Sequence, residues 1–448
     1  MTDEIPVCAR LDFAGCNVLE SDRIAATFRS MRRAIIIPAI LLVFSVNTAL
    51  GWGQGHRLIR EWAVARLPEW QTSWIGEENL RRLCADYKSL QDRHAGGKAP
   101  ELDPYCKVPG VRLSLHDVNG PTASARGMVW YLDQIVAHLK RGDTDEAMKF
   151  LGVLCHWNED PGCPSAHSSP ISEEQLKILL PPPTDKARYN YLYGAGGIAD
   201  IGKYTIPEGS YEPRLLGRTI DEVALRIYQH QRLLERGAAA RIIPLVQDMM
   251  YGDGNKAAAE RAAAAAANAR HICDVIHTSL CLAKSRFDGG RKLDEPQSLT
   301  EWLPDPTKKR APHPYYVTGF LTNQALDAKR KLHPLRFAAG AGQIRRGFGT
   351  GAPFTISYTL APNPYRRFSV QVGFHSAAAA NGAVSFEIHA NGKTIHRTLM
   401  LRVGGAPIEI DVELPESEIL KLALVTVPED AADSLANLVV WAEPTLRR

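Results

Sequence analysis

The spacing of hydrophobic residues divides the chain into two parts. From residue 52 to about residue 331, apolar side chains recur at i, i+3 and i+4, the spacing of amphipathic helices. After about residue 347 the period changes to two, which is typical of strands with one buried face. The pattern predicts an all-α domain over 52–331 and an all-β sandwich over 332–448. The clearest helical positions are Leu58, Ile59, Trp62, Ala63, Leu67, Leu132, Ile135 and Leu139, and the clearest strand positions are Phe368, Val370, Val372, Phe374, Val384, Phe386, Ile388, Ile408, Ile410, Val412 and Leu414.

Local signals place several ends of these elements. Asp143, followed by Glu146, predicts a capping box, and the helix that follows ends at an Asp-Pro pair. An alanine-rich run predicts one long helix through 257–282, because alanine is the best helix former. Asn391-Gly392 predicts a tight hairpin, and Asn381-Gly382 offers a second one.

The N-terminal segment has the pattern of a secretory signal peptide. Two arginines after Met31 precede the apolar run 34–46, and small residues follow at Ala49 and Gly51. We expect residues 1–51 to comprise a polar extension and this leader, with Met31 as an alternative start. Cleavage after Gly51 leaves Trp52 as the mature N-terminus. The protein is then secreted or periplasmic; the alternative is a membrane anchor formed by an uncleaved segment 34–51.

Composition narrows the class of protein. With 45% hydrophobic and 23% charged residues in 448, the chain can bury large cores, and a mean hydropathy of −0.19 excludes a polytopic membrane protein. A net charge of +4, without a basic run between aromatic residues, does not indicate a nucleic-acid groove. An exported chain predicts disulfides. Their connectivity stays open among the six cysteines after the leader, Cys84, Cys106, Cys155, Cys163, Cys273 and Cys281.

Histidines and aspartates in a particular order suggest metal chemistry. His156 and Asp160 are four residues apart, which places imidazole and carboxylate on one face of a helix, and His167 follows after a proline-containing loop. Such a trio can hold a divalent metal. By itself it is more often a surface pair, but here Trp52 and His56 lie at the predicted mature terminus, and His116 lies between them and the trio.

This ordered set resembles the zinc-dependent phospholipase C and single-strand-specific nuclease superfamily. The resemblance covers about residues 52–280 and implies three zinc ions in an all-helical cleft, with a metal-activated hydroxide as nucleophile. It implies one zinc on Trp52, through its free α-amine and carbonyl, with His56 and Asp160. It implies a second zinc on Asp86, His116, His156 and the bridging Asp160, and a third zinc site that begins at His167.

Two departures from the family pattern affect these assignments. The family's third site needs a further histidine and carboxylate, but this chain has Tyr189 to Gly194 there, without histidine. A replacement is the segment that carries His271, Asp274 and His277 on a broad arc of one helix; the alternative is the polar edge of an amphipathic helix. Asp86 lacks the preceding proline that the family usually has. Asp92, Asp103 and Asp117 therefore stay open as alternatives for this ligand.

The strand-rich part resembles a carbohydrate-binding module of galactose-binding-like sandwich fold. The matching segments are 367–370, 382–388 with 391–393, and 441–444. The resemblance implies a glycan ligand. These are mostly core and turn positions, and Trp441 has two interpretations, a buried core residue or a platform for a sugar.

Together these patterns predict a secreted zinc-dependent hydrolase of phosphodiester bonds, with two or three zinc ions. We expect Asp160, His156 and His116 to carry the chemistry. The substrate is phospholipid or single-stranded nucleic acid, and the sequence does not decide between them. The alternative is a metal- or glycan-binding protein that has lost hydrolysis with the third site. No specific protein partner can be inferred.

Overall fold

The structure is a computed structural model of the chain. It describes residues 52–164, 205–287, 296–305, 321–327, 329–340, 342–430 and 437–448. The predicted leader and anchor, residues 1–51, lie outside the described residues. So do His167 and the segment from Tyr189 to Gly194.

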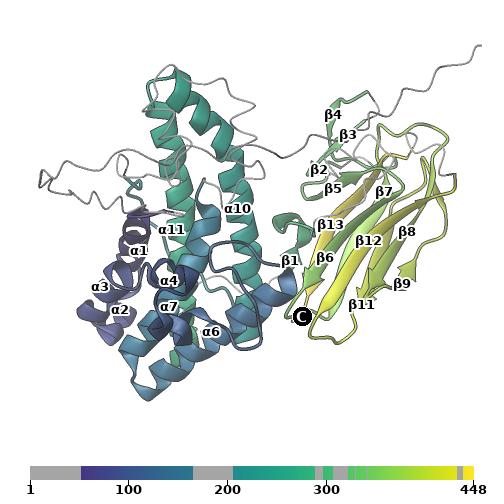
Figure 1. Ribbon diagram of the computed structural model, residues 1–448. Coiled ribbons are helices and arrows are strands. Elements are labelled where there is room, and N and C mark those ends of the chain that lie inside the picture. Colours follow the sequence, from purple (N-terminus) through teal and green to yellow (C-terminus); the bar gives the residue numbers. More distant parts are fainter. Residues whose placement is uncertain are drawn as a thin grey trace, which may run out of the picture. The chain divides into compact units, whose positions relative to one another are not determined.

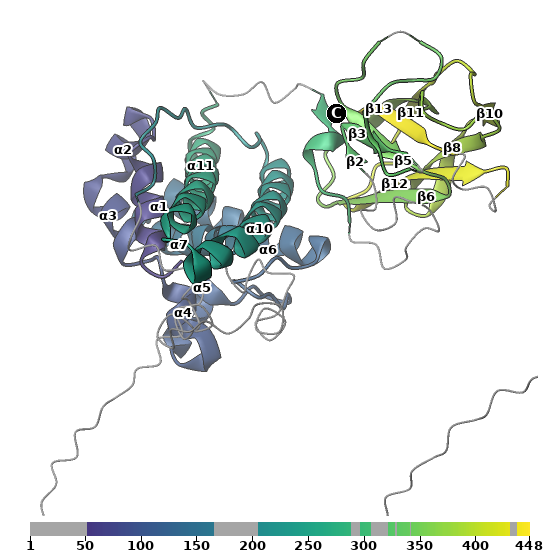
Figure 2. The same ribbon diagram turned by 90° about the horizontal axis from the view of Figure 1, so that it is seen from above.

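The first part of the chain is helical, as predicted. Figure 2 shows α11 in the middle of the bundle, and it contacts α1, α6, α7 and α10. The short 3-10 segments are η1 (Ala95–Gly97), η2 (Pro100–Leu102), η3 (Asp160–Gly162) and η4 (Leu299–Glu301). The helices are α1 (Gly55–Val64), α2 (Glu69–Ile75), α3 (Glu77–Ala85), α4 (Leu90–His94), α5 (Asp103–Cys106), α6 (Pro121–Arg141), α7 (Thr144–Glu159), α10 (Ile220–Tyr251) and α11 (Asn255–Lys284).

Most helical predictions are confirmed, and the capping box is not. The helix predicted after residue 143 is α7, and the alanine-rich run lies within α11. Asp143 is the N-cap residue of α7, but its side chain makes no capping hydrogen bond. It pairs instead with Arg141, at 3.3 Å, while Glu146 accepts hydrogen bonds from Tyr105 and Lys149. The two side chains are thus occupied by neighbours outside the first turn.

The second part consists of antiparallel sheets (Figure 1). One sheet has the order β11-β7-β13-β5-β2, with β1 paired to β13; another has the order β10-β8-β12-β6, with β9 paired to β8; β3 and β4 form a separate pair. The strands are β1 (Gln297–Ser298), β2 (Leu321–Thr322), β3 (Gln324–Leu326), β4 (Leu332–Pro334), β5 (Gly347–Thr350), β6 (Phe354–Leu360), β7 (Arg367–Phe374), β8 (Ala383–Ala390), β9 (Lys393–Arg397), β10 (Leu401–Arg402), β11 (Ile408–Glu413), β12 (Leu420–Pro428) and β13 (Val439–Arg447).

The core of this sandwich lies between the two larger sheets. Trp441 of β13 is buried completely, and its ring meets the ring of Phe386 on β8 edge to face, with centroids 5.2 Å apart. The sheet that contains β13 also includes β1 and β2, which precede the predicted domain boundary at residue 332.

The two predicted hairpin turns have different outcomes. Asn391-Gly392 joins β8 to β9 with φ of 51° and 79°, as a type I′ turn requires. Asn381-Gly382 is not a hairpin turn: it lies between β7 and β8, which belong to different sheets. An Asn-Gly pair marks a turn in both places, but only pairing between the flanking strands makes a hairpin.

The predicted disulfides are not formed. Cys84, Cys106, Cys155, Cys163, Cys273 and Cys281 are all buried, and no disulfide joins any two of them. Cys273 and Cys281 lie on the same helix, α11, as the sequence suggested, and Cys273 Sγ lies 3.4 Å from the carbonyl oxygen of Ala63. These cysteines pack as small hydrophobic residues in the helical core.

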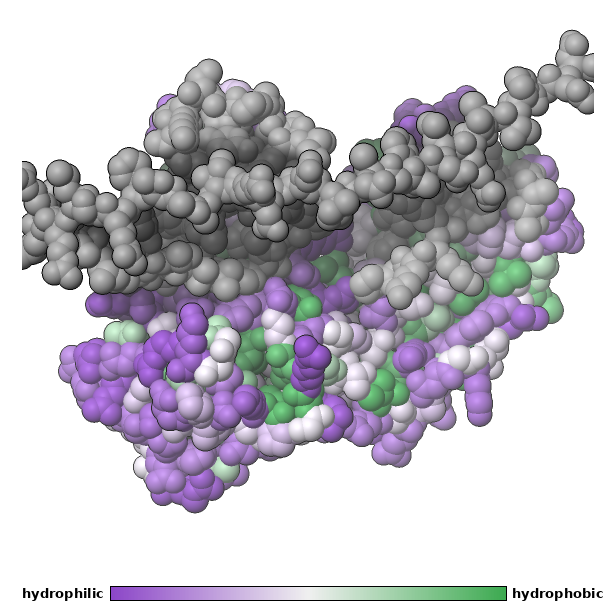
Figure 3. All heavy atoms as spheres, viewed as in Figure 1, coloured by the Kyte–Doolittle hydropathy of each residue, from purple (hydrophilic) through white to green (hydrophobic). Residues whose placement is uncertain are grey.

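Within the described residues, no helix combines the length and the apolar character needed to cross a membrane. On the face shown in Figure 3, hydrophilic residues predominate over the helices α2 and α3. Most of the buried hydrophobic residues of the helical part belong to one cluster, which includes Ile59, Leu132 and Trp157.

Candidate functional site

Four segments of the helical part bring acidic and imidazole side chains together. α1 contributes His56, α4 contributes Asp92, and the connection between α5 and α6 contributes His116. The end of α7 contributes His156, and Asp160 follows it as the first residue of η3. The buried face of α1 consists of Gly55, His56, Ile59, Arg60 and Ala63, so the helical period itself turns His56 toward α7.

Asp160 is at the centre of this cluster and is buried completely. Its Oδ1 lies 3.3 Å from Nε2 of His56, and its Oδ2 lies 2.8 Å from Nδ1 of His116 and 3.1 Å from Nε2 of His156. Asp92 adds a second carboxylate, with Oδ1 3.6 Å from Nε2 of His156 and 3.9 Å from Nδ1 of His116. Three imidazoles and two carboxylates therefore converge.

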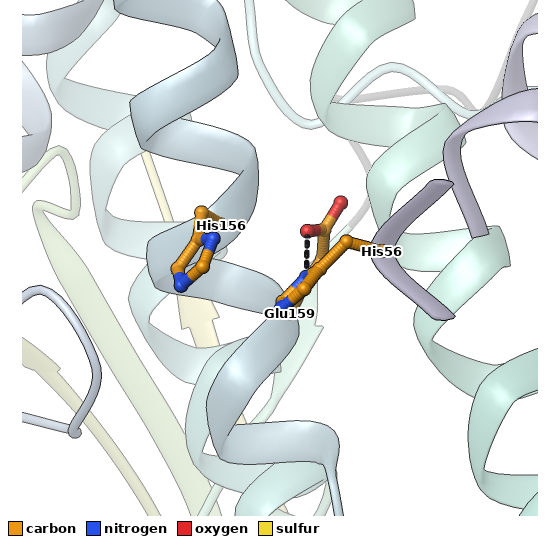
Figure 4. A group of neighbouring side chains, drawn as sticks. All are labelled: His56, His156 and Glu159. Atoms are coloured by element: carbon orange, nitrogen blue, oxygen red, sulfur yellow. Dashed lines mark hydrogen bonds and ion pairs between the residues drawn. The ribbon is translucent and has the colours of Figure 1, made fainter. Parts of the chain in front are cut away.

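Two of the histidines are fixed through the ring nitrogen that faces away from Asp160. His56 Nδ1 lies 2.5 Å from a carboxylate oxygen of Glu159, and His156 Nδ1 lies 2.6 Å from the carbonyl oxygen of Lys88. A carbonyl oxygen can only accept, so His156 carries its proton on Nδ1. Figure 4 shows His156 and His56 reaching toward each other from α7 and α1, and their rings are stacked at 4.2 Å.

The atoms that face the centre of the cluster lack hydrogen bonds. They are His56 Nε2, His156 Nε2, Asp92 Oδ1 and Asp160 Oδ1, all of them buried. Buried polar atoms without partners are costly, and several of them aimed at one place indicate a binding site for a cation. Imidazole nitrogens and carboxylate oxygens suit zinc, and histidine ligands characteristically donate their other N–H to a carboxylate or carbonyl. The residues present therefore fit a zinc centre.

The electrostatics of the cluster favour charged carboxylates. Burial acts to raise the pKa of Asp160, but His156, His116 and His56 outweigh it and hold that pKa well below its usual value. Burial acts to lower the pKa of His156, but Asp160 and Asp92 outweigh it, so that this pKa is raised. A buried, charged Asp160 offers the negative charge that a bound cation requires.

Trp52 lies beside the cluster. Its side chain is 1% exposed, and its indole Nε1 donates a hydrogen bond of 2.8 Å to the carbonyl oxygen of Glu159. The Trp52 carbonyl accepts from the backbone N–H of Gly55 in the turn that begins α1. Trp52, the predicted mature N-terminus, is therefore held by Glu159, the residue that directly precedes Asp160 in the chain.

The structure does not bring Asp86 to the cluster. Its side chain is 49% exposed at the end of α3 and lies 3.4 Å from Arg81. Asp92, one of the alternatives named from the sequence, occupies the expected position near His116 and His156. Both α3 and α4 contact α7, but Asp86 is the exposed C-cap residue of α3, whereas α4 places Asp92 beside His116 and His156.

The proposed replacement for a third site is not assembled. His271 Nε2 faces Asn158 Oδ1 at 3.3 Å, Asp274 accepts hydrogen bonds from Tyr211 and the backbone of Arg214, and His277 Nδ1 faces Gln71 Oε1 at 3.1 Å. These side chains share one helix but each has a separate set of partners. In the described ranges, the groups able to surround an ion contain only members of the cluster around Asp160 and Glu159.

Sequence reasoning missed two members of the site, Arg60 and Glu159. Both are buried completely and paired at 2.8 Å. Their signal is positional: Arg60 lies four residues after His56, on the apolar stripe of α1, and Glu159 precedes Asp160 in a run that is buried throughout. A charged residue at a buried helical position requires a partner, and each of these two is the other's partner.

Comparison with known proteins supports the interpretation of the second part. A family model for the NPCBM/NEW2 domain matches residues 315–447. The sequence predicted a carbohydrate-binding module there, and this match confirms it. The matched region begins before the predicted boundary at residue 332. No curated protein matches the chain.

Solved structures resemble parts or most of the chain. Alpha toxin from Clostridium absonum is 9% identical, with a TM-score of 0.34, over 87% of this chain and 92% of that one. CBM51 from Clostridium perfringens GH95, solved with methyl-galactose, is 16% identical over 34% of this chain and 99% of that one, with a TM-score of 0.25. A structure of CBM51-2 in complex with GlcNAc and INT domains, from Clostridium perfringens ZmpB, is 16% identical over 35% of this chain, with a TM-score of 0.25. The chain spans about a third of the length of that last structure.

Proposed function

We propose that the helical part is a zinc-dependent hydrolase of phosphodiester bonds. The observation that carries the proposal is the convergence of four buried ligand-type atoms, from His56, His156, Asp92 and Asp160, none of which has a hydrogen bond. The order Trp52, His56, His116, His156 and Asp160, which resembles the phospholipase C and nuclease superfamily, supports the reaction class.

The residues divide into two ligand sets that share Asp160. Trp52, His56 and Asp160 would hold one zinc ion, and Asp92, His116, His156 and Asp160 a second. When bound, such ions polarise phosphate oxygens and activate water at neutral pH. Asp160 presents one oxygen to His56 and the other to His116 and His156, so it can serve both sets.

Cleavage before Trp52 belongs to this proposal. An α-amine has an ordinary pKa near 8, so it can lose its proton close to neutrality and offer a lone pair to a metal. N-terminal sequencing of the secreted protein tests the cleavage position. A chain that retains extra residues before Trp52 should bind less zinc, and unchanged zinc content would exclude a role for the amine.

The substrate class can be decided by direct assay. The mature chain is loaded with zinc and offered phosphatidylcholine vesicles and single-stranded DNA in parallel. Asp160→Asn is the control, because it keeps the shape of the side chain and removes its charge. Hydrolysis of one substrate, lost in the control, identifies the class. Fewer than two zinc ions per chain, together with hydrolysis of neither substrate, would overturn the proposal.

We also propose that residues 315–447 bind a glycan and hold the hydrolase near its substrate. The NPCBM/NEW2 match supports this role. Two of the similar structures contain methyl-galactose and GlcNAc, which makes these sugars the first probes. Isothermal titration of the full chain with each sugar tests the proposal. Binding of neither sugar would count against a glycan-binding role for residues 315–447.

A specific observation favours a second function, metal or glycan binding without hydrolysis. His271, Asp274 and His277 do not assemble a replacement third site. If hydrolysis needs three ions, a chain with two would retain zinc without turnover. Stoichiometric zinc in the absence of hydrolysis of any phosphodiester offered would favour this alternative.

A further inference from the structure

Glu159 connects the two proposed ligands that α1 and its preceding turn provide. Its carboxylate faces His56 Nδ1 at 2.5 Å, and its backbone carbonyl accepts the indole N–H of Trp52 at 2.8 Å. The same carbonyl accepts a second hydrogen bond, of 2.9 Å, from Asn268 on α11. One residue at the end of α7 therefore contacts both Trp52 and His56.

Arg60, one helical turn after His56 on α1, also holds the Glu159 carboxylate. Its Nε donates to Glu159 Oε1 at 2.8 Å, and its Nη2 donates to Oε2 at 3.1 Å. The remaining guanidinium donors reach the carbonyl oxygens of Leu83 on α3 and Gly152 on α7, each at 2.9 Å. Arg60 is thereby fixed by two other helices, α3 and α7, and the fork geometry fixes the plane of the carboxylate.

The arrangement leaves His56 with one nitrogen for a metal. If Glu159 accepts the Nδ1 proton, the lone pair of His56 lies on Nε2, the atom that faces Asp160 Oδ1 at 3.3 Å. Geometry alone also groups Glu159 with His56 and His156 as a metal-holding set. Both oxygens of Glu159 already accept charge-assisted hydrogen bonds from Arg60, however, so this carboxylate is committed to the protein.

We propose that Glu159, held by Arg60, is the positioning residue of the Trp52 and His56 side of the centre: it accepts the Nδ1 proton of His56 and so directs Nε2 toward Asp160 and the zinc. The inference rests on the proposed function, because it assigns an orienting partner to one of its ligand sets. Partners of this kind typically change metal affinity by about 10–100-fold when removed.

A purely structural ion pair is the competing explanation, and the two explanations differ in what they predict. Replacing a complete buried ion pair by apolar residues of similar size is often neutral for stability, whereas removing one partner leaves an uncompensated buried charge. The double substitution Arg60→Met with Glu159→Leu removes both charges together. A structural role predicts that zinc affinity is unchanged in the double variant. A positioning role predicts weaker zinc affinity in a double variant whose zinc-free form stays folded.

The test uses the full mature chain and zinc alone as the probe. Zinc affinity is measured by competition with a chromophoric chelator, and stability by thermal unfolding of the zinc-free protein. Asp145→Asn is the matched control, because it removes the ion pair with Arg82 at the other end of α7. We expect the double variant to lose about 10–100-fold in affinity for one of its zinc ions, Glu159→Gln to lose less, and Asp145→Asn to match the wild type.

A second measurement needs no variant. Nitrogen-15 NMR of the histidine side chains in the zinc-loaded wild type should show His56 with its proton on Nδ1 and none on Nε2. Protonation on Nε2, or unchanged zinc affinity in a folded double variant, would overturn the positioning role while the proposed function stands. A wild-type protein that binds no zinc would overturn the proposed function, and the positioning role with it.

Discussion

His156 and Asp160 lie one helical turn apart at the end of α7, with Nε2 of the imidazole 3.1 Å from Oδ2 of the carboxylate. Both side chains are buried completely. The imidazole is fixed further by the carbonyl oxygen of Lys88. The pair is therefore preorganised, which is the condition for a metal site that does not depend on loop movement.

Asp160→Asn tests whether this carboxylate serves both ligand sets. The substitution removes the charge that three histidines share, and an amide offers only one oxygen. We expect both zinc ions to be lost or weakened and hydrolysis to fall by roughly 100-fold or more. Zinc is counted by elemental analysis after dialysis. Loss of one ion only would show that Asp160 does not bridge.

Asp92 and Asp86 give opposite predictions for the same chemical change. Asp92→Asn removes the carboxylate that faces His116 and His156, and we expect zinc content and hydrolysis to fall by at least about 10-fold. Asp86→Asn removes an exposed partner of Arg81, so it should change stability little and leave zinc content unchanged. The reverse result would return the ligand to the position expected from the sequence.

These two aspartates also show how far the sequence can predict the site. His56, His116, His156 and Asp160 were identified because ligand type and helical spacing are local properties. The sequence could not decide between Asp86 and Asp92, because residues 86–106 contain short helices and turns whose path depends on packing against other helices. Arg60 and Glu159 were missed for a related reason. A buried charge has no signature of its own until its partner, 99 residues away, is known.

The fold was predictable to a similar depth. Periodicity identified α6 and the strands β7, β8 and β11, and the alanine-rich run identified α11, because both signals are local. The prediction of a hairpin at Asn381-Gly382 was wrong, because local turn chemistry does not reveal that β7 and β8 belong to different sheets. The prediction of disulfides does not agree with the structure, because pairing depends on which cysteines meet in space and the sequence does not show this.

His277 should make the wild type less stable in acid. Burial lowers its pKa to about 4, below the ordinary 6.5. The unfolded chain therefore takes up a proton between pH 6.5 and 4 that the folded chain does not, and folding stability falls as pH decreases through this window. In His277→Asn, whose amide can still donate to Gln71, this loss is absent. The difference in unfolding free energy should change by about 1.4 kcal/mol per pH unit at most.

Chemical denaturation at several pH values measures this difference. Asp274, whose pKa burial raises to about 7, contributes a slope of opposite sign, but it is present in both proteins and cancels when they are subtracted. A pH-independent difference between wild type and His277→Asn would mean that the imidazole titrates normally in the folded protein.

Trp441 should stabilise the sandwich and take no direct part in sugar binding. Its ring is buried completely and packs against Phe386 across the two sheets, so it presents no face to a ligand. Trp441→Phe leaves a cavity, and we expect about 1–3 kcal/mol less stability. Leu399→Ser is the control, because this side chain is 89% exposed and has no packing to lose. Denaturant unfolding, followed by far-ultraviolet circular dichroism, measures the unfolding free energy of both variants. Sugar binding is measured by titration with methyl-galactose in the absence of denaturant. A folded Trp441→Phe protein with normal stability but weakened sugar binding would instead show that this tryptophan is the sugar platform.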